Sequence, residues 1–163
     1  MIRVETQDFD IGAEVKALTK GRTDIGAVVT FSGLVRDMND GAVASMELEH
    51  YPGMTEKELA RIEEEAHRRW PLQASLIVHR VGRLLPGDNI VLVIAASAHR
   101  QAAFEAASFL MDYLKTRAPF WKKEDRNGEA QWVDARESDG EAMTDAPSKA
   151  SRRWGAPAFA LPS

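Results

Sequence analysis

The fold is decided by the stretch LIVHRVGRLLPGDNIVLVIAAS, residues 76–97. Two apolar runs rich in β-branched residues, 76–81 and 89–97, lie on either side of the sequence PGD at 86–88. Runs of this length and composition predict strands, and a proline–glycine pair between them predicts a turn. The stretch therefore predicts two neighbouring antiparallel strands.

Other segments add further strands to this pair. Residues 2–6 are expected to form a short edge strand, and residues 25–35 a central strand because they are almost continuously apolar. Residues 36–44 are rich in Asp, Asn and Gly, which predicts a loop. Residues 45–51 alternate in polarity and predict a half-buried strand, and residues 131–136 are a candidate last strand.

Two helices are predicted between these strands. Asp10 is a candidate N-cap for the first, and Thr55 with Glu58 is a candidate capping box for the second, which Pro71 is expected to stop. The residues expected to face the core recur at helical spacing. They are Ile11, Val15 and Leu18 in the first helix and Leu59, Ile62, Ala66 and Trp70 in the second.

A third, long helix is predicted from about residue 98 to residue 117, ending before Pro119. Its expected buried stripe consists of Phe104, Ala107, Met111 and Leu114. The order of helices and strands predicts an α+β fold with a mainly antiparallel sheet.

The composition indicates one globular domain. The chain has 163 residues, of which 44% are apolar, and this is enough material for a single core. No run approaches the roughly 18 apolar residues of a membrane span, and the amino end lacks the pattern of a signal peptide, so a cytoplasmic protein without membrane association is expected. After residue 139 Ala, Ser and Pro dominate without periodicity, which predicts a domain over 1–139 and a disordered tail over 140–163.

The chain contains no cysteine. This excludes disulfides, thiolate metal sites, a cysteine nucleophile and a persulfide carried on the chain itself. If the protein handles sulfur, another molecule must bring it.

Cations are concentrated around the third helix of a chain whose formal net charge is −4. Residues 97–123 contain two carboxylates, Glu105 and Asp112, against five cations: Arg100, Lys115, Arg117, Lys122 and Lys123. Large apolar side chains lie between these cations, and charge beside apolar surface is costly unless it meets an anion. The segment is therefore predicted to be half core helix and half anion-binding site.

Each cation also has a simpler explanation. A lysine near a helix end often only complements the helix dipole, and a strand-end arginine such as Arg36 is often a solvated charge. His99 and Arg100 open a helix, where free backbone N–H groups favour anions but exposed pairs are also common. His99 and Lys115 lie 16 residues apart, roughly 24 Å along a straight helix, so one chain cannot bring both to one small ligand. Either only one end of the helix binds the ligand, or the two ends meet across a homodimer, and the homodimer is favoured.

Other kinds of site fit the sequence poorly. It contains no Walker sequence, no dinucleotide glycine fingerprint and no HExxH motif. Glu49 and His50 would point to opposite faces of a strand, so Glu47, Glu49 and His50 do not suit one ion, and no metal is expected. An acidic chain with one compact basic patch fits a small anion better than a nucleic acid.

Several strings together resemble the large, catalytic subunit of molybdopterin synthase. They are FSGLVR (31–36), LEHYPGMTE (48–56), RWPL (69–72), PGD (86–88), SAHR (97–100), MDYLKTRAPFWKKE (111–124) and WVDARESD (132–139). They cover most of residues 1–139 in the family's order, and the match over 111–124 is far more specific than a short motif. SRRW (151–154) resembles the family's usual close, which leaves 155–163 as an extension.

The resemblance implies a fold, partners and a reaction. The fold is expected to be of the α/β-hammerhead type, and the assembly a homodimer that binds two small, ubiquitin-like carrier subunits to form a heterotetramer. Each carrier is expected to place a C-terminal Gly-Gly thiocarboxylate in a pocket of the large subunit. There sulfur is transferred to cyclic pyranopterin monophosphate, which builds the dithiolene of molybdopterin. No permanently bound cofactor is implied, and a cysteine-free chain agrees with sulfur that arrives on the carrier.

The resemblance also implies the site residues. Lys115 and Lys122 match the family's catalytic lysines. Substrate-binding positions are matched by these two lysines and by Leu34, Val35, Arg36, His99, Arg100, Lys123 and Glu124, and pocket-lining positions by Phe31, Met111 and Arg136. Both expected substrates are anions, which suits lysine and arginine. Lys115 is expected to act at the reacting carbon, as acid–base or by transient covalent attack, while His99 and Arg100 reach the site from the partner chain.

The residues alone leave two other classes of function open. One is a non-catalytic anion- or nucleotide-binding module that kept the cationic patch, and the other is a scaffold that only docks a ubiquitin-like partner. The set of Lys115, Lys122, Arg36 and Arg100 favours the enzyme, because a scaffold has no use for a cationic pocket.

Overall fold

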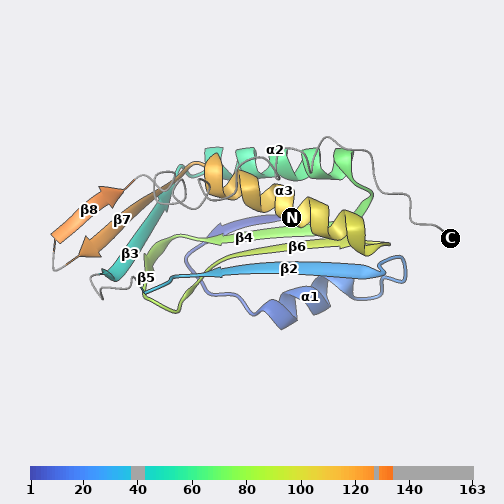
Figure 1. The fold of residues 1–163 in the computed structure, drawn as a ribbon, viewed down its shortest axis with the longest axis horizontal. Helices are drawn as coiled ribbons and strands as arrows, with labels where there is room; N and C mark the ends of the chain where they lie inside the picture. The colour runs from blue at the N-terminus through green and yellow to red at the C-terminus, as the bar shows by residue number, and fades with distance from the viewer. Residues whose placement is uncertain (38–42, 127–128, 134–163) are drawn as a thin grey trace.

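The structure, a computed structural model, describes residues 1–37, 43–126 and 129–133. Within these residues it contains three helices and two four-stranded sheets (Figure 1). In chain order the elements are β1 (Ile2–Glu5), α1 (Ile11–Thr19), β2 (Ala27–Leu34), β3 (Val43–His50), α2 (Met54–Arg69), β4 (Leu72–Arg80), β5 (Gly82–Leu84), β6 (Asn89–Ser97), α3 (Arg100–Thr116), β7 (Phe120–Arg126) and β8 (Glu129–Val133). The predicted α+β class is confirmed. None of the described helices has the length and apolar character needed to cross a membrane.

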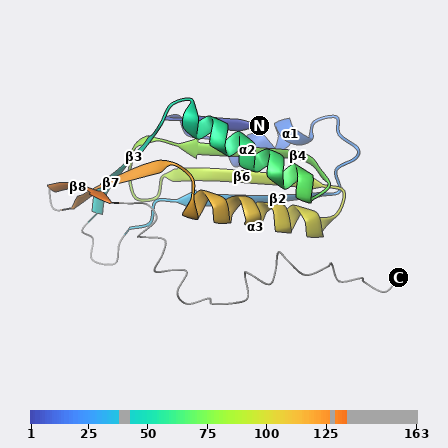
Figure 2. The same ribbon diagram turned by 90° about the horizontal axis from the view of Figure 1, so that it is seen from above.

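The larger sheet has the strand order β1-β4-β6-β2. The predicted pair of strands forms its centre, because β4 and β6 run antiparallel with Ile77 opposite Val93. β2 is also antiparallel to β6, and β1 pairs in parallel with β4. Helices α2 and α3 cover one face of this sheet and α1 covers the other (Figures 1 and 2). The sheet is therefore mainly antiparallel, as predicted.

The period-two alternation of β4 and β6 explains why both faces of the sheet are covered. Ile77 and Val93 pack with Leu59 and Leu110 under α2 and α3. Their sequence neighbours point the other way, against α1. The cluster on that side contains Phe9, Leu76, Val78, Leu92 and Ile94, with Ile11, Val15 and Leu18 packed on it. Truncating one of these fully buried leucines to alanine would cost about 2–5 kcal/mol.

Helix α1 begins as the sequence predicts. The Asp10 carboxylate accepts a hydrogen bond from the Ala13 N–H at 2.9 Å and so caps the helix. This satisfies one of the free N–H groups of the first turn. The helix can therefore start directly after the loop that follows β1.

The position predicted for β2 is wrong: it is an edge strand, because its one partner among the described strands is β6. Val28 and Phe31 are exposed on it. A nearly continuous apolar run indicates that both faces of a strand meet apolar surface, but it carries no information on whether both backbone edges are paired. An apolar edge strand with an unpaired backbone edge in one chain offers a surface on which a second chain can pack.

The start of α2 also differs from the prediction. Its N-cap is Gly53, at φ 84°, and the Glu56 carboxylate accepts the Gly53 N–H at 2.7 Å. Thr55 is fully buried and donates its hydroxyl to the Pro119 carbonyl at 3.1 Å, while Glu58 accepts from the Tyr113 hydroxyl. Glu56, two positions before the expected Glu58, closes the cap, because the Thr55 hydroxyl donates to Pro119 and accepts the Tyr51 N–H at 3.0 Å instead.

The predicted buried stripe of α3 is confirmed at Ala107 and Met111 and wrong at Phe104. Phe104 is 62% exposed. The buried residues are Ala103, Ala106, Ala107, Leu110, Met111 and Tyr113. Ala106 and Ala107 pack against Ala95 of β6, so small side chains let the helix approach the sheet closely. The helix packs closely on the sheet because alanines occupy the face of α3 that contacts it. The large Phe104 side chain lies on the opposite, exposed face of the helix.

The smaller sheet, of order β5-β3-β7-β8, lies beside one end of the larger sheet (Figures 1 and 2). All of its pairs are antiparallel. Met46 and Leu48 of β3 form its core with Val35 and Leu84, which confirms the predicted half-buried strand over 45–51. The chain enters this sheet from β4 through Gly82, at φ 90°, a backbone conformation that favours glycine.

Several predicted segments lie wholly or partly outside the described residues. These are positions 38–42 of the expected loop over 36–44, positions 134–136 of the expected last strand and the expected tail over 140–163. The last described strand, β8, covers the first part of the segment predicted over 131–136.

Candidate active site

A pocket of about 130 Å³ opens where the two sheets meet the C-terminal end of α3. Its walls come from β2, β3, β4, β6, α3 and β7. The lining is mostly aliphatic and aromatic, and it holds two lysines, Lys115 and Lys122. The basic stretch singled out in the sequence therefore supplies two cations to one cavity.

The chain reversal after α3 brings the two lysines together. Lys115 lies in the last turn of α3, and the N–H groups of Arg117 and Ala118 both bond to the Tyr113 carbonyl, at 2.8 and 3.1 Å, which closes the helix. The chain then turns back at Pro119 and becomes β7. Two lysines seven positions apart therefore face one cavity from a helix and from a strand.

The alternation of β7 decides which of its side chains reach the pocket. Phe120 and Lys122 both line it. Trp121 lies between them in sequence and stacks edge-on against Tyr51 at a centroid distance of 3.8 Å. Since neighbouring strand residues point to opposite faces, Trp121 anchors the strand while its two neighbours build the site.

The electrostatics of the pocket favour an anion. Among the described residues that line it there are two lysines and no Asp or Glu. Lys115 is exposed at the edge, and Lys122 is half-buried. Cations beside apolar walls attract an anion more strongly than cations in bulk water, because the local dielectric constant is low.

His79 is a pocket residue that the sequence reasoning missed. It is 8% exposed, and its ring stacks on Phe120 at a centroid distance of 3.8 Å with an interplanar angle of 16°. Its Nδ1–H donates to the Arg80 carbonyl at 2.8 Å. The pKa of His79 is lowered to about 4, mainly by burial; the electrostatic interactions with Lys115 and His50 act in the same direction, and the hydrogen bond to the Arg80 carbonyl opposes them. The ring is therefore neutral near pH 7. In the sequence, the one feature that indicates this buried histidine is its position inside the apolar run 76–81.

Two other predicted residues are found in the pocket lining, namely Leu34 from β2 and Met111 from α3. Three neighbouring predictions lie outside it. Val35 is buried in the core of the smaller sheet, and Arg36 is exposed just beyond β2. Phe31 is 39% exposed on the open side of β2. The structure thus brings together four predicted residues within one chain.

The match to known families covers most of the part that builds this pocket. Residues 4–117 match the family described as "MoaE protein". This chain belongs to the MoaE family. It is 59% identical over 155 residues to a molybdopterin synthase catalytic subunit of Mesorhizobium japonicum, covering 94% of this chain and 92% of that protein.

Solved structures agree with this membership. A molybdopterin biosynthesis MoaE protein from Burkholderia ambifaria MC40-6 has a TM-score of 0.77 at 53% identity, covering 96% of this chain and 99% of that one. A chain in a complex of subunits 1 and 2 of molybdopterin-converting factor from Helicobacter pylori 26695 has the same fold, with a TM-score of 0.70 at 18% identity over 81% of this chain and 89% of that one. The family, the fold class and the catalytic function expected from the sequence are confirmed. Of the functions left open by the residues, the comparisons support the enzyme.

The remaining predicted residues of this MoaE-family chain lie elsewhere or are not described. His99 and Arg100 are exposed at the other end of α3, which has 17 residues and so is roughly 24 Å long. Lys123 and Glu124 lie in strand β7, but their side chains are outside the described part of the structure. Arg136 lies wholly outside it. The roles of all these residues stay predictions.

Proposed function

We propose that this chain transfers sulfur from the C-terminal thiocarboxylate of a small, ubiquitin-like carrier subunit to cyclic pyranopterin monophosphate, forming the dithiolene of molybdopterin. The observation that carries the proposal is the meeting of Lys115 and Lys122 at one pocket whose described lining contains no carboxylate. A thiocarboxylate and a cyclic phosphate are both anions. Two lysines at an apolar cavity can hold the first and stabilise charge that develops during transfer.

Lys115 is the residue best placed to act at the reacting carbon. It extends from the last turn of α3 to the edge of the pocket, where it is accessible, while Lys122 lies deeper on β7. An accessible lysine at an apolar edge can exchange a proton with the substrate or attack a carbonyl. Arg36 follows directly after β2 at the same end of the sheet and is assigned to the phosphate. The substrate is the only small molecule in this proposal, which includes no permanently bound cofactor.

The carrier subunit is the proposed macromolecular partner. The H. pylori chain of the same fold comes from a complex of subunits 1 and 2 of molybdopterin-converting factor. This precedent and the pocket support a carrier that docks beside the smaller sheet and places its tail between the sheets. Two carriers on a homodimer would form a heterotetramer. A cytoplasmic location stays a prediction from the sequence.

Homodimerisation is proposed because the pocket and the second cation pair lie at opposite ends of α3. In a two-fold dimer with antiparallel α3 helices, the N-terminal end of one helix lies beside the C-terminal end of the other. His99 and Arg100 of one chain would then reach the Lys115 pocket of its partner. The open edge of β2, which runs next to α3 and exposes Val28 and Phe31, is a suitable contact surface (Figure 2).

One assay tests the proposed reaction. The purified chain is mixed with a thiocarboxylated carrier and cyclic pyranopterin monophosphate, and the dithiolene product is measured. Product that depends on all three components is expected. A correctly folded chain that binds the carrier but forms no product would contradict the proposal.

Subunit mixing tests the shared site separately. Inactive His99→Ala and Lys115→Ala homodimers are mixed and allowed to exchange subunits. Each mixed dimer then contains one intact site, so random exchange is expected to restore about a quarter of the wild-type activity. Mixed dimers that form, as shown by mass spectrometry, but stay inactive would refute the shared site.

A further inference from the structure

His79 is held in one orientation from two sides. Its ring lies flat against Phe120 of β7, and its Nδ1–H donates to the Arg80 carbonyl at 2.8 Å. A neutral imidazole has one N–H and one lone pair, so a proton fixed on Nδ1 leaves the lone pair on Nε2. The ring lines the same cavity as Lys115. The site thus contains a hydrogen-bond acceptor that carries no charge.

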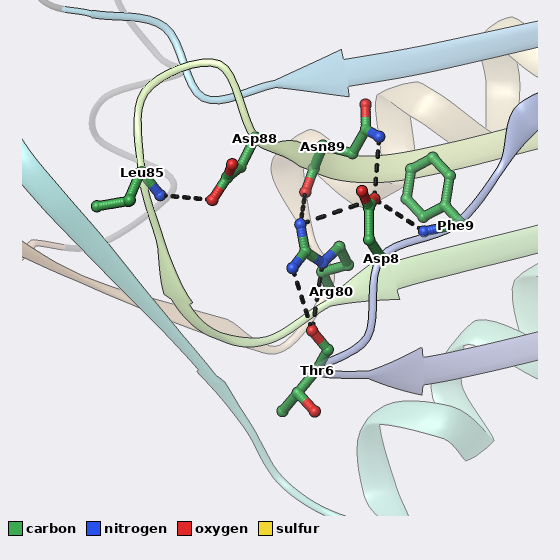
Figure 3. Close-up of polar contacts among 7 residues, drawn as sticks. All are labelled: Thr6, Asp8, Phe9, Arg80, Leu85, Asp88 and Asn89. Carbon is green, nitrogen blue, oxygen red and sulfur yellow. Dashed lines mark hydrogen bonds and ion pairs between the residues drawn. The ribbon is translucent and has the colours of Figure 1, made fainter.

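The carbonyl that holds this tautomer is itself anchored. The Arg80 guanidinium donates to the Asn89 carbonyl at 3.0 Å and to the Thr6 carbonyl at 3.2 and 3.3 Å, and it lies 3.8 Å from the Asp8 carboxylate (Figure 3). Asp8 is fixed in turn by the Asn89 side-chain amide at 3.0 Å. The end of β4 is therefore tied to the loop after β1 and to the start of β6. The peptide that carries the Arg80 carbonyl is fixed as well, because the Val81 N–H donates to the Glu5 carbonyl at 3.0 Å.

The charged and titratable groups around His79 come from each neighbouring element. Lys115 faces it from α3, Lys122 lines the same pocket from β7, and His50 approaches from β3, where it bonds to Glu56 of α2 at 3.1 Å. A positive charge on the His79 ring would be repelled by the lysines of the pocket. A neutral acceptor is attracted to an ammonium group, because charge-assisted hydrogen bonds are the stronger ones.

We propose that His79 is a positioning residue of this site: its Nε2 accepts a hydrogen bond from the Lys115 ammonium group and orients that group toward the pocket. The inference rests on the proposed function for its catalytic consequence only. His79 acts through Lys115, which remains the group that meets the substrate. An ammonium group held in this direction can donate a proton to the substrate or bind an anion in the pocket.

Nuclear magnetic resonance tests the tautomer without any assay of activity. Long-range ¹H–¹⁵N spectra of the ¹⁵N-labelled chain distinguish a protonated Nδ1 from a protonated Nε2. The Nδ1–H tautomer of His79 is expected throughout pH 5.5–8, a range about the ordinary histidine pKa. A proton on Nε2, or a ring that becomes charged in this range, would overturn the proposal.

Chemical labelling tests the contact with Lys115. The rate at which an amine-reactive ester modifies Lys115 is measured by mass spectrometry, with the exposed Lys57 of α2 as internal reference. His79→Phe keeps an aromatic ring for the stack but removes the acceptor, so Lys115 should react several-fold faster, while His79→Gln should stay close to wild type. Equal Lys115 rates in wild type and His79→Phe would overturn the proposal.

Kinetics of the complete synthase test the catalytic consequence. His79→Phe is expected to lower kcat by about tenfold to a hundredfold with little change in KM, and His79→Gln to recover much of it. Ser75→Ala is the matched control: Ser75 is buried on the same strand and donates to Glu63 at 2.7 Å, but it is not part of the pocket lining. An equal loss in Ser75→Ala and His79→Phe would show a structural effect and overturn the proposal. If wild type forms no product, the proposed function fails, while labelling and tautomer still decide the His79–Lys115 contact.

Discussion

The two ends of α3 carry similar cations in very different surroundings. At the C-terminal end Lys115 meets a cavity built by both sheets, with Lys122 and His79 beside it. At the N-terminal end His99 and Arg100 are exposed, and neither of them lines this cavity. The same kind of side chain therefore belongs to a formed site at one end and to an open surface at the other.

This difference shows what one chain can build alone. A cavity needs walls from several elements, and the junction of the two sheets provides them at only one end of the helix. The other end offers cations and free backbone N–H groups, which bind anions weakly when water competes. A second chain could supply the missing walls, and this difference between the two ends of α3 supports the proposed homodimer.

The largest expected effect comes from removing the cation at the formed site. Lys115→Ala should lower the single-turnover rate of sulfur transfer by about a thousandfold, because it removes the group proposed to act at the reacting carbon. Lys57→Ala, on the exposed face of α2, is the matched control and should keep wild-type activity. A Lys115→Ala rate within tenfold of wild type would mean that the C-terminal end is not the catalytic one.

The next effect is on the stability of the folded chain and tests whether His79 is shielded from water in the pocket. The pKa of His79 is lowered from 6.5 to about 4 in the folded chain, so below pH 6.5 the unfolded chain binds a proton that the folded chain does not. Stability should therefore fall as the pH drops from 6.5 to 4, by up to about 3 kcal/mol from this group.

Urea denaturation of wild type and His79→Phe at several pH values measures this contribution. The stability of the variant should depend less steeply on pH between 6.5 and 4, since it lacks the titrating group. Parallel curves for the two proteins would show that His79 does not lie in a desolvated position.

A third prediction tests whether the edge of β2 is the proposed dimer surface. Val28→Lys places a charge on the open edge of β2 and should convert the dimer to monomers, with about a hundredfold loss of activity because the partner's cations are lost. Ala17→Lys, on the exposed part of α1, is the control. Light scattering gives the mass; an unchanged mass for Val28→Lys would exclude this edge as the interface.

The smallest expected effect belongs to the open end of α3. Arg100→Ala should raise the KM for the cyclic phosphate by about tenfold and leave kcat nearly unchanged, because a phosphate contact binds substrate and transition state alike. Arg22→Ala, at an exposed arginine of the loop between α1 and β2 that forms an ion pair with Asp24, should leave both constants unchanged. A fall in kcat without a change in KM would assign Arg100 to the reaction itself.

Much of the fold was predictable from short-range patterns. Alternation in 45–51, the hairpin-like pair in 76–97 and the helical spacing of Leu59, Ile62 and Ala66 all appear in the structure as predicted. These patterns are local, because the period of each element decides which side chains share a face. Whether a segment forms a helix or a strand was therefore the part of the fold that the sequence predicted best.

The errors share a cause. Apolar character predicts a central position for strand 25–35, which is an edge strand, and a core position for Phe104, which is exposed. Apolar character gives the preference of a residue for burial, but the element that packs against it decides where burial occurs. The local sequence predicts Thr55 in the helix cap, but its hydroxyl donates to the Pro119 carbonyl, 64 positions away in the chain.

By itself, the sequence determined the class of fold, the long amphipathic helix, the family and the basic stretch from which Lys115 and Lys122 come. The tertiary structure alone decided which of the cations share a cavity and that a buried, neutral His79 lies beside them. It also decided which strand has an open edge. The reason is physical: charge and periodicity are properties of neighbours in the chain, whereas a pocket and its dielectric depend on how distant segments pack.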